Sequence, residues 1–149
     1  IERQLPFGES LRSTKRTLYK ISDACLRFWY RVYSPHRTRW ASYSEDVKNN
    51  LIRMHASSVL EDEIRHSEPG AARYWEDNLE FDCVRALDSN TLLVSEIKWK
   101  PLTTAERNNL QKDLHLKCMR SKLVQKFKEI RVEVLDRSDA IERILILTP

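Results

Sequence analysis

Glycine is scarce in this sequence of 149 residues, in which only Gly8 and Gly70 occur. Globular proteins contain about 7% glycine, and the loops that cradle nucleotide phosphates need several glycines close together. The sequence therefore excludes a Walker A loop and a dinucleotide-binding fingerprint. We expect no nucleotide site within these residues.

Long apolar runs are also missing. The longest, such as residues 92–94 and 144–147, are far shorter than the roughly 18 residues that cross a bilayer. No signal peptide opens the sequence. The three cysteines, Cys25, Cys83 and Cys118, are odd in number and widely spaced, which fits neither a zinc site nor a disulfide framework. We therefore expect a soluble protein without a membrane segment, in a reducing, cytoplasmic setting.

The composition is otherwise that of an ordinary globular protein. Apolar residues make up 41% and charged residues 32% of the chain, which excludes wholesale disorder and collagen-like repeats. An excess of 26 basic over 22 acidic residues gives a formal charge of +4. Because the chain begins at Ile1 rather than Met and its opening reads like internal sequence, we expect a fragment of a longer protein.

The first third of the chain predicts a hairpin followed by a helix. Residues 2–7 and 17–22 have strand character and flank a polar, basic loop at 8–16. Asp23 is a good helix cap, and Ser34-Pro35 ends the helix because proline disfavours helical geometry in the preceding residue. This helix is apolar over most of its circumference, so we expect Trp29 and Tyr30 in the core. The alternative is that the rings stack on nucleic-acid bases.

The rest of the chain predicts alternating helices and strands. In order, these are a helix from a capping box at Ser42 and Glu45 to Glu68-Pro69-Gly70, strands at 79–87 and 91–99, a helix from Thr103, and strands at 129–135 and 143–147. This order predicts a mixed α/β (α+β) fold, in which helices pack on a mixed sheet.

The predicted hairpin at 79–99 places like charges together. A three-residue turn at 88–90 puts Asp82 across from Glu96, and Glu80 across from Lys98. Carboxylates whose Cβ atoms are about 5 Å apart repel one another, and a divalent cation would offset the repulsion. An acidic pair beside a lysine predicts metal-assisted phosphoryl chemistry. The alternative is an ordinary strand face in contact with water.

Two resemblances follow from these residues. Asp82, with Glu96-Ile97-Lys98 on the next strand, resembles the PD-(D/E)XK nuclease signature, with Phe81 where the motif has proline. The wider sequence resembles the C-terminal domain of unknown function found on prokaryotic AAA+-type, archaeal-ATPase-like ATPases. The segments that carry this likeness are Arg3-Gln4-Leu5-Pro6-Phe7, Tyr19-Lys20-Ile21-Ser22-Asp23, Leu26-Arg27-Phe28-Trp29-Tyr30, Leu60-Glu61, Tyr74-Trp75, Glu80-Phe81-Asp82 and Glu96-Ile97-Lys98-Trp99.

The resemblance implies a restriction-endonuclease-like mixed sheet flanked by helices in residues 23–149, after the end of a winged-helix segment in residues 1–22. An ATPase module would precede them. It also implies Mg²⁺ or Mn²⁺ as cofactor, held by Asp82 and Glu96, with Lys98 as the catalytic lysine. A glutamate on a helix often joins such sites, and Glu61 matches that position best, with Glu63 as its competitor.

A basic stretch on and after the predicted third helix offers contacts for a nucleic-acid partner. Its members include Lys117, Arg120 and Lys122, followed by Lys126 and Lys128. The alternative is a solvated charged face. For the whole chain two functions stay open: a metal-dependent phosphodiesterase acting on DNA, or a catalytically inactive DNA- or protein-binding domain that regulates the ATPase. A purely structural domain is a third possibility, and the number of subunits stays open.

Overall fold

The computed structural model describes residues 1–12 and 15–147, so Ser13 and Thr14 of the predicted loop at 8–16 lie outside the described residues. The chain folds as a mixed α/β structure. Its helices and strands are β1 (Glu2–Gln4), β2 (Leu18–Lys20), α1 (Ala24–Phe28), α2 (Glu45–Ser67), β3 (Ala72–Glu76), β4 (Leu79–Ala86), β5 (Thr91–Ile97), α3 (Thr104–Met119), β6 (Glu129–Leu135) and α4 (Arg137–Leu147). Shorter helical turns are η1 (Trp29–Tyr33), η2 (Ser34–His36), η3 (Trp40–Ser42) and η4 (Lys122–Gln125).

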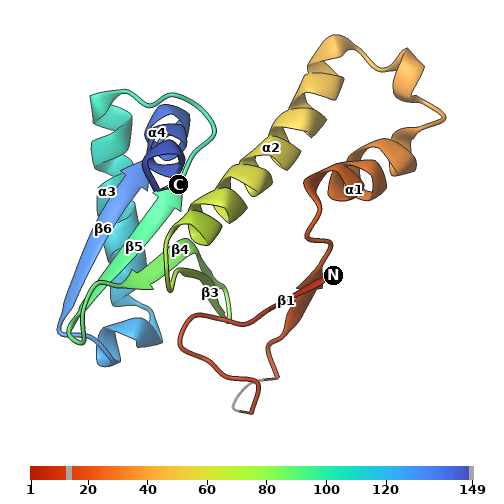
Figure 1. The fold of residues 1–149 in the computed structure, drawn as a ribbon. Coiled ribbons are helices and arrows are strands. Elements are labelled where there is room, and N and C mark those ends of the chain that lie inside the picture. The colour runs from red at the N-terminus through yellow and green to blue at the C-terminus, as the bar shows by residue number, and fades with distance from the viewer. Residues whose placement is uncertain (13–14, 148–149) are drawn as a thin grey trace.

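The main sheet has the strand order β3-β4-β5-β6 (Figure 1). The first three strands run antiparallel because tight turns connect them, whereas β6 runs parallel to β5 because α3 carries the chain back between them. The sheet is thus mixed, as the sequence predicts. None of the described helices is both long enough and apolar enough to span a membrane.

Helices cover both faces of the sheet. On one face, α3 packs through Leu114 and Cys118 onto β4 and β5 side chains such as Phe81 and Val94. On the other face, α2 and α4 contribute residues that surround Cys83, Ile97 and Leu135; these helix residues are Leu60, Ile64 and Ala140. The second face carries the helix that brings Glu61 toward the sheet.

The N-terminal hairpin is confirmed, with strands shorter than predicted. β1 and β2 pair antiparallel, Glu2 opposite Lys20. Asp62 of α2 ties this hairpin and α1 to the rest of the fold, because its buried carboxylate accepts hydrogen bonds from Lys20 at 2.5 Å and from Arg27 and Arg65. Burial alone would raise the pKa of Asp62, but these three cations lower it to about 2.

The predicted strand at 143–147 is wrong, since these residues end α4. Asp136 begins this helix: its side chain accepts the N–H groups of Ser138 at 2.9 Å and Asp139 at 3.1 Å. Ala140 and Ile144, four residues apart, then pack on the face occupied by α2. A short apolar run does not distinguish strand from helix, and here the cap and the packing decide.

Two further predictions need correction, and one strand was missed. Trp29 and Tyr30 are 50% and 59% exposed, so they are not core residues. The cap of α2 is Ser44, which accepts the N–H of Val47 at 3.4 Å, rather than Ser42. Strand β3 was not predicted, because its sequence ARYWE lacks clear alternation and follows closely on a helix end.

Candidate nuclease-like site

The hairpin of β4 and β5 is confirmed in its register. Cys83 pairs with Ser95 and Val84 with Val94, as a three-residue turn requires. Asp88 holds that turn, because its carboxylate accepts the N–H groups of Asn90 at 2.7 Å and Thr91 at 2.9 Å. The register brings Asp82 to the point where the pairing of β4 with β5 ends.

An irregularity in β4 changes which way its side chains point. Ala72 pairs with Val84 whereas Tyr74 pairs with Phe81, so two steps along β3 span three along β4. Phe81 and Val84 consequently lie in the core under α3, and Cys83 lies in the core under α2. Strict alternation along a strand would put Phe81 and Cys83 on one face, and the irregularity in β4 places them on opposite faces instead. Bulges of this kind re-aim side chains and are common beside active sites.

Asp82 reaches across to β5 at this irregularity. Its Oδ2 accepts the backbone N–H of Ile97 at 2.9 Å, in place of a carbonyl of the strand ladder. Burial raises the pKa of Asp82, and the negative charge of Glu96 raises it further, against the opposing effects of the Ile97 N–H and Lys98. The pairing of β4 with β5 ends at Cys83 and Ser95, so the predicted direct pairing of Asp82 with Glu96 lies one position beyond it, and the two carboxylates interact through repulsion.

Lys98 contacts one carboxylate, that of Glu96, and lies within electrostatic range of Asp82 and Glu61. Its Nζ donates to Oε1 of Glu96 at 2.5 Å, and the two side chains remain 34% and 18% exposed. Burial alone would lower the pKa of Lys98, but Glu96, Asp82 and Glu61 raise it above its ordinary value. Lys98 is therefore a permanent cation near neutral pH. The predicted pairing of Lys98 with Glu80 is absent, because the pairing of β4 with β5 ends at Cys83 and Ser95; Glu80 accepts from Nε of Arg73 at 2.8 Å.

Glu61 joins this group from α2, between the buried Leu60 and Asp62. Burial raises the pKa of Glu61 to about 7, with Asp82 adding to the rise and Arg65 opposing it. Glu63, the competing candidate, is exposed and lines a hollow beside α1. The structure thus brings Glu61, and not Glu63, into electrostatic contact with Asp82 and Lys98.

Arg65 is a supporting residue that the sequence reasoning missed. Its guanidinium donates to the backbone carbonyl of Asp82 and to the carboxylate of Asp62, so it holds the irregular part of β4 against α2. Arg65 follows Glu61 by four residues on the same helix, so both side chains lie on one face of α2. This spacing is the feature of the sequence from which a role for Arg65 beside Glu61 could have been predicted.

The donor set suits a hard divalent cation in chemistry, since Mg²⁺ prefers carboxylate oxygens and retains water. Within residues 1–12 and 15–147, no three His, Cys, Asp or Glu side chains lie close enough together to coordinate one metal ion. The ammonium of Lys98 supplies positive charge beside Glu96, at 2.5 Å.

The predicted phosphate contacts differ from one another. Lys117 lies with its Nζ 5.1 Å from the ring centre of Phe81, the neighbour of Asp82. Arg120 is exposed at the end of α3. The ammonium of Lys122 lies 3.8 Å from both Glu76 and Asp77, so nearby acids already balance its charge.

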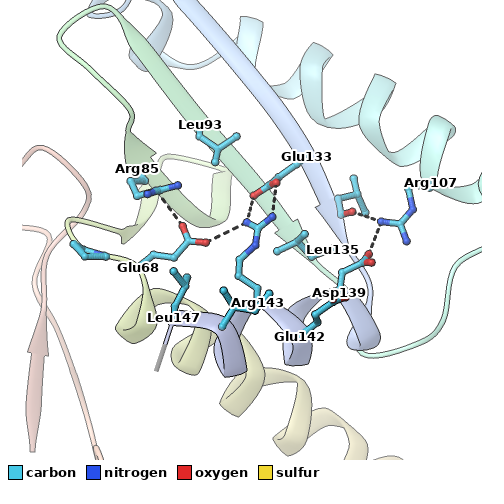
Figure 2. Close-up of a pocket in the computed structure, with 13 residues that line it drawn as sticks. Glu68, Arg85, Leu93, Arg107, Glu133, Leu135, Asp139, Glu142, Arg143 and Leu147 are labelled. Carbon is cyan, nitrogen blue, oxygen red and sulfur yellow. Dashed lines mark hydrogen bonds and ion pairs between the residues drawn. The ribbon is translucent and has the colours of Figure 1, made fainter. Parts of the chain in front are cut away.

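A second charged cluster lies on the sheet beside α4 and lines a hollow of about 660 Å³ (Figure 2). Arg143 donates to both oxygens of Glu133, at 2.5 and 2.9 Å, and to Glu68 at 3.1 Å, while Arg85 lies 3.1 Å from Glu68. Each cation here has an acidic partner, so the cluster links α4 to the sheet. It includes none of the predicted site residues.

Comparison with known proteins places the chain in a family. Neither the curated proteins nor the solved structures provide a match to it. The sequence family DUF234, described as archaea bacterial proteins of unknown function, matches residues 31–110. This range is more than half of the chain and contains Glu61, Asp82, Glu96 and Lys98. The chain therefore belongs to the DUF234 family of archaeal and bacterial proteins of unknown function.

Proposed function

We propose that Glu61, Asp82, Glu96 and Lys98 form a metal-dependent phosphodiesterase site of the PD-(D/E)XK type that acts on DNA. The observation that carries the proposal is that Lys98 donates to Glu96 beside Asp82, which accepts the N–H of Ile97, while burial and a neighbouring carboxylate raise the pKa values of both Asp82 and Glu61. Repulsion between neighbouring carboxylates costs stability, and a bound Mg²⁺ or Mn²⁺ would relieve it.

The four side chains suit distinct roles. Asp82 and Glu96 would hold the cation, which when bound would polarise a phosphodiester and lower the pKa of a water. Lys98 stays protonated at Nζ, so it suits stabilising negative charge on a phosphoryl oxygen rather than abstracting a proton. Glu61, with a pKa of about 7, suits accepting or returning a proton at its carboxylate near neutral pH.

We further propose that the chain is the C-terminal part of a prokaryotic AAA+-type ATPase, in which other residues bind the nucleotide. The two glycines of this chain offer no phosphate loop, in keeping with that division. Lys117 and Arg120 would contact the phosphate backbone on the α3 side of the site. Lys122 would contribute less, because Glu76 and Asp77 offset its charge.

One observation favours the second candidate, a catalytically inactive domain that binds DNA or protein and regulates the ATPase. Lys98 is bonded to Glu96, one of the two proposed metal ligands. In a domain that had lost its metal, the ammonium of Lys98 would take the place of the cation and neutralise part of the acidic cluster. The two candidates differ in whether Asp82 and Glu96 bind a divalent ion.

The test is nicking of supercoiled plasmid in Mg²⁺ and in Mn²⁺, with a chelator control, by the wild type and by Asp82→Asn and Lys98→Ala. Glu80→Gln is the matched control, because Glu80 lies on the same strand and pairs with Arg73 instead of the site. We expect nicking that both site variants and the chelator abolish and that Glu80→Gln retains. Absence of both nicking and calorimetric Mn²⁺ binding would reject the phosphodiesterase and support the inactive regulatory domain.

A further inference from the structure

The segment between α1 and α2 carries aromatic rings on the surface of the protein. Trp29 and Tyr30 are 50% and 59% exposed. Trp29 lies beside Tyr33 with 5.0 Å between ring centres, and Tyr33 lies 5.5 Å from Trp40. The series continues from Trp40 to Tyr43 at 6.4 Å. Most of these rings therefore contact one another in a row instead of filling the core.

The backbone of this segment presents the rings outward. Phe28 ends α1 and packs edge-on against His55 of α2, with 5.4 Å between ring centres. The next residues, Trp29–Tyr33, form a π-helical turn in which only Val32 is buried. π-Helical turns are rare and occur frequently at functional sites. The segment lies at the end of α2 away from the sheet (Figure 1), so a ligand can reach it without entering the main fold.

The charge of the segment has one sign. Residues 24–43 contain four arginines and neither Asp nor Glu. Arg27 is buried and bonded to Asp62. The other three, Arg31, Arg37 and Arg39, are exposed and form no ion pair with any residue that the structure describes. The rings are thus bordered by unpaired cations, which favours a polyanion as the occupant.

Single-stranded nucleic acid combines negative charge with flat apolar rings, and it is bound elsewhere by aromatic side chains together with basic ones. In a duplex the base faces are already stacked on each other, so a row of exposed rings offers them nothing further. An apolar protein partner would match the rings but would leave the three arginines without counter-charges.

We propose that Trp29, Tyr30 and Trp40 form a stacking surface for the unpaired bases of single-stranded nucleic acid, with Arg31, Arg37 and Arg39 contacting its phosphates. This aromatic surface acts through binding alone and needs neither the metal ligands nor Lys98. It goes beyond the proposed phosphodiesterase, and it stands if that proposal fails.

Fluorescence anisotropy of a labelled oligothymidine, an oligouridine and a duplex of equal length tests the surface, with the complete 149-residue chain. We expect both single strands to bind more tightly than the duplex. Trp29→Ala should weaken single-strand binding about five-fold or more, the effect of losing one stacked base, and Trp29→Phe should restore part of it. Leu145→Ala is the matched control, because Leu145 is an exposed apolar residue on α4.

Two further variants separate the contributions. Replacing Arg31, Arg37 and Arg39 by glutamine should flatten the salt dependence of binding, by about 0.7 in the logarithmic slope for each phosphate that the protein no longer neutralises. Trp29→Ala should weaken single-strand binding by the same factor with and without a chelator, so loss of metal at the proposed phosphodiesterase site is distinguished from failure of the aromatic surface. Circular dichroism and urea midpoints confirm that the variants remain folded.

Three results would overturn the proposal. One is equal affinity for duplex and single strand that Trp29→Ala does not change, which would leave only non-specific charge attraction. Another is no measurable single-strand binding at low salt. The third is self-association that Trp29→Ala abolishes while single-strand binding is unaffected, which would assign the aromatic surface to a protein interface.

Discussion

Glu61→Gln should stabilise the protein above neutral pH, because the buried carboxylate of Glu61 opposes folding when it is ionised. Its pKa rises from 4.5 to about 7 in the folded state. Native Glu61 therefore keeps its proton between these values while the unfolded chain releases it, so stability falls as the pH rises from 4.5 to 7. At about 1.4 kcal/mol per pH unit, the full cost above pH 7 is about 3 kcal/mol. This is an upper bound, because part of the side chain still contacts water.

Urea unfolding at pH 5 and pH 8 measures this effect. Glutamine has the shape of glutamate but no charge, so Glu61→Gln should raise the free energy of unfolding by up to about 3 kcal/mol at pH 8 and by about 1 kcal/mol or less at pH 5. Glu63→Gln, an exposed change two residues away, should alter stability by no more than about 0.5 kcal/mol at either pH.

The outcome that refutes the reasoning is a loss of stability of equal size at both pH values. Glu61 would then be a structural hydrogen-bond acceptor whose charge the fold requires, and its ionisation would not strain the site. A gain at pH 8 that becomes smaller in Mn²⁺, because the cation offsets the charge of ionised Glu61 in the wild type, would link the strain to cation binding.

Three other changes test the fold around the site. Asp62→Ala should lower the free energy of unfolding by about 3–5 kcal/mol, because Arg27 stays buried without its partner. The control Asp46→Ala, on the exposed first turn of α2, should cost under about 1 kcal/mol. Similar urea midpoints for the two variants would contradict this. Because Asp62 has a pKa of about 2 against 3.8 for an ordinary aspartate, the wild type should lose this contribution as the pH falls from about 4 to 2, and an Asp62→Ala curve of the same steepness would contradict it. Phe81→Ala should cost about 3–5 kcal/mol in urea unfolding through the cavity it leaves under α3, and a loss below about 1 kcal/mol would show that the core closes around it. Thr103→Ala should cost about 1 kcal/mol by removing the capping box of α3, and an unchanged thermal midpoint would show that the cap is dispensable.

Local patterns in the sequence predicted much of the fold. The turn at 88–90 determines the register of β4 with β5, because a three-residue loop leaves one way to pair the flanking residues. The capping box at Thr103 predicted the start of α3. The alternation in residues 129–135 predicted β6. In each case the determining interaction joins residues close in sequence, so it can be read without the fold.

Within the candidate site, the sequence by itself determined that an acidic pair and a lysine meet on adjacent strands. The tertiary structure decided the remaining geometry. The extra residue in β4 turns Asp82 toward the N–H of Ile97, and this depends on how β3 pairs with β4. The choice of Glu61 over Glu63 depends on which face of α2 packs on the sheet.

The same division holds at both ends of the chain. Periodicity alone made residues 143–147 a strand and placed Trp29 and Tyr30 in the core. In the structure, Asp136 caps a helix that Ala140 anchors against α2, and the turn at Trp29–Tyr33 leaves Trp29 and Tyr30 exposed. Apolar side chains do not by themselves specify what covers them; that depends on the elements that fold against them, and here the described residues leave half or more of Trp29 and Tyr30 exposed.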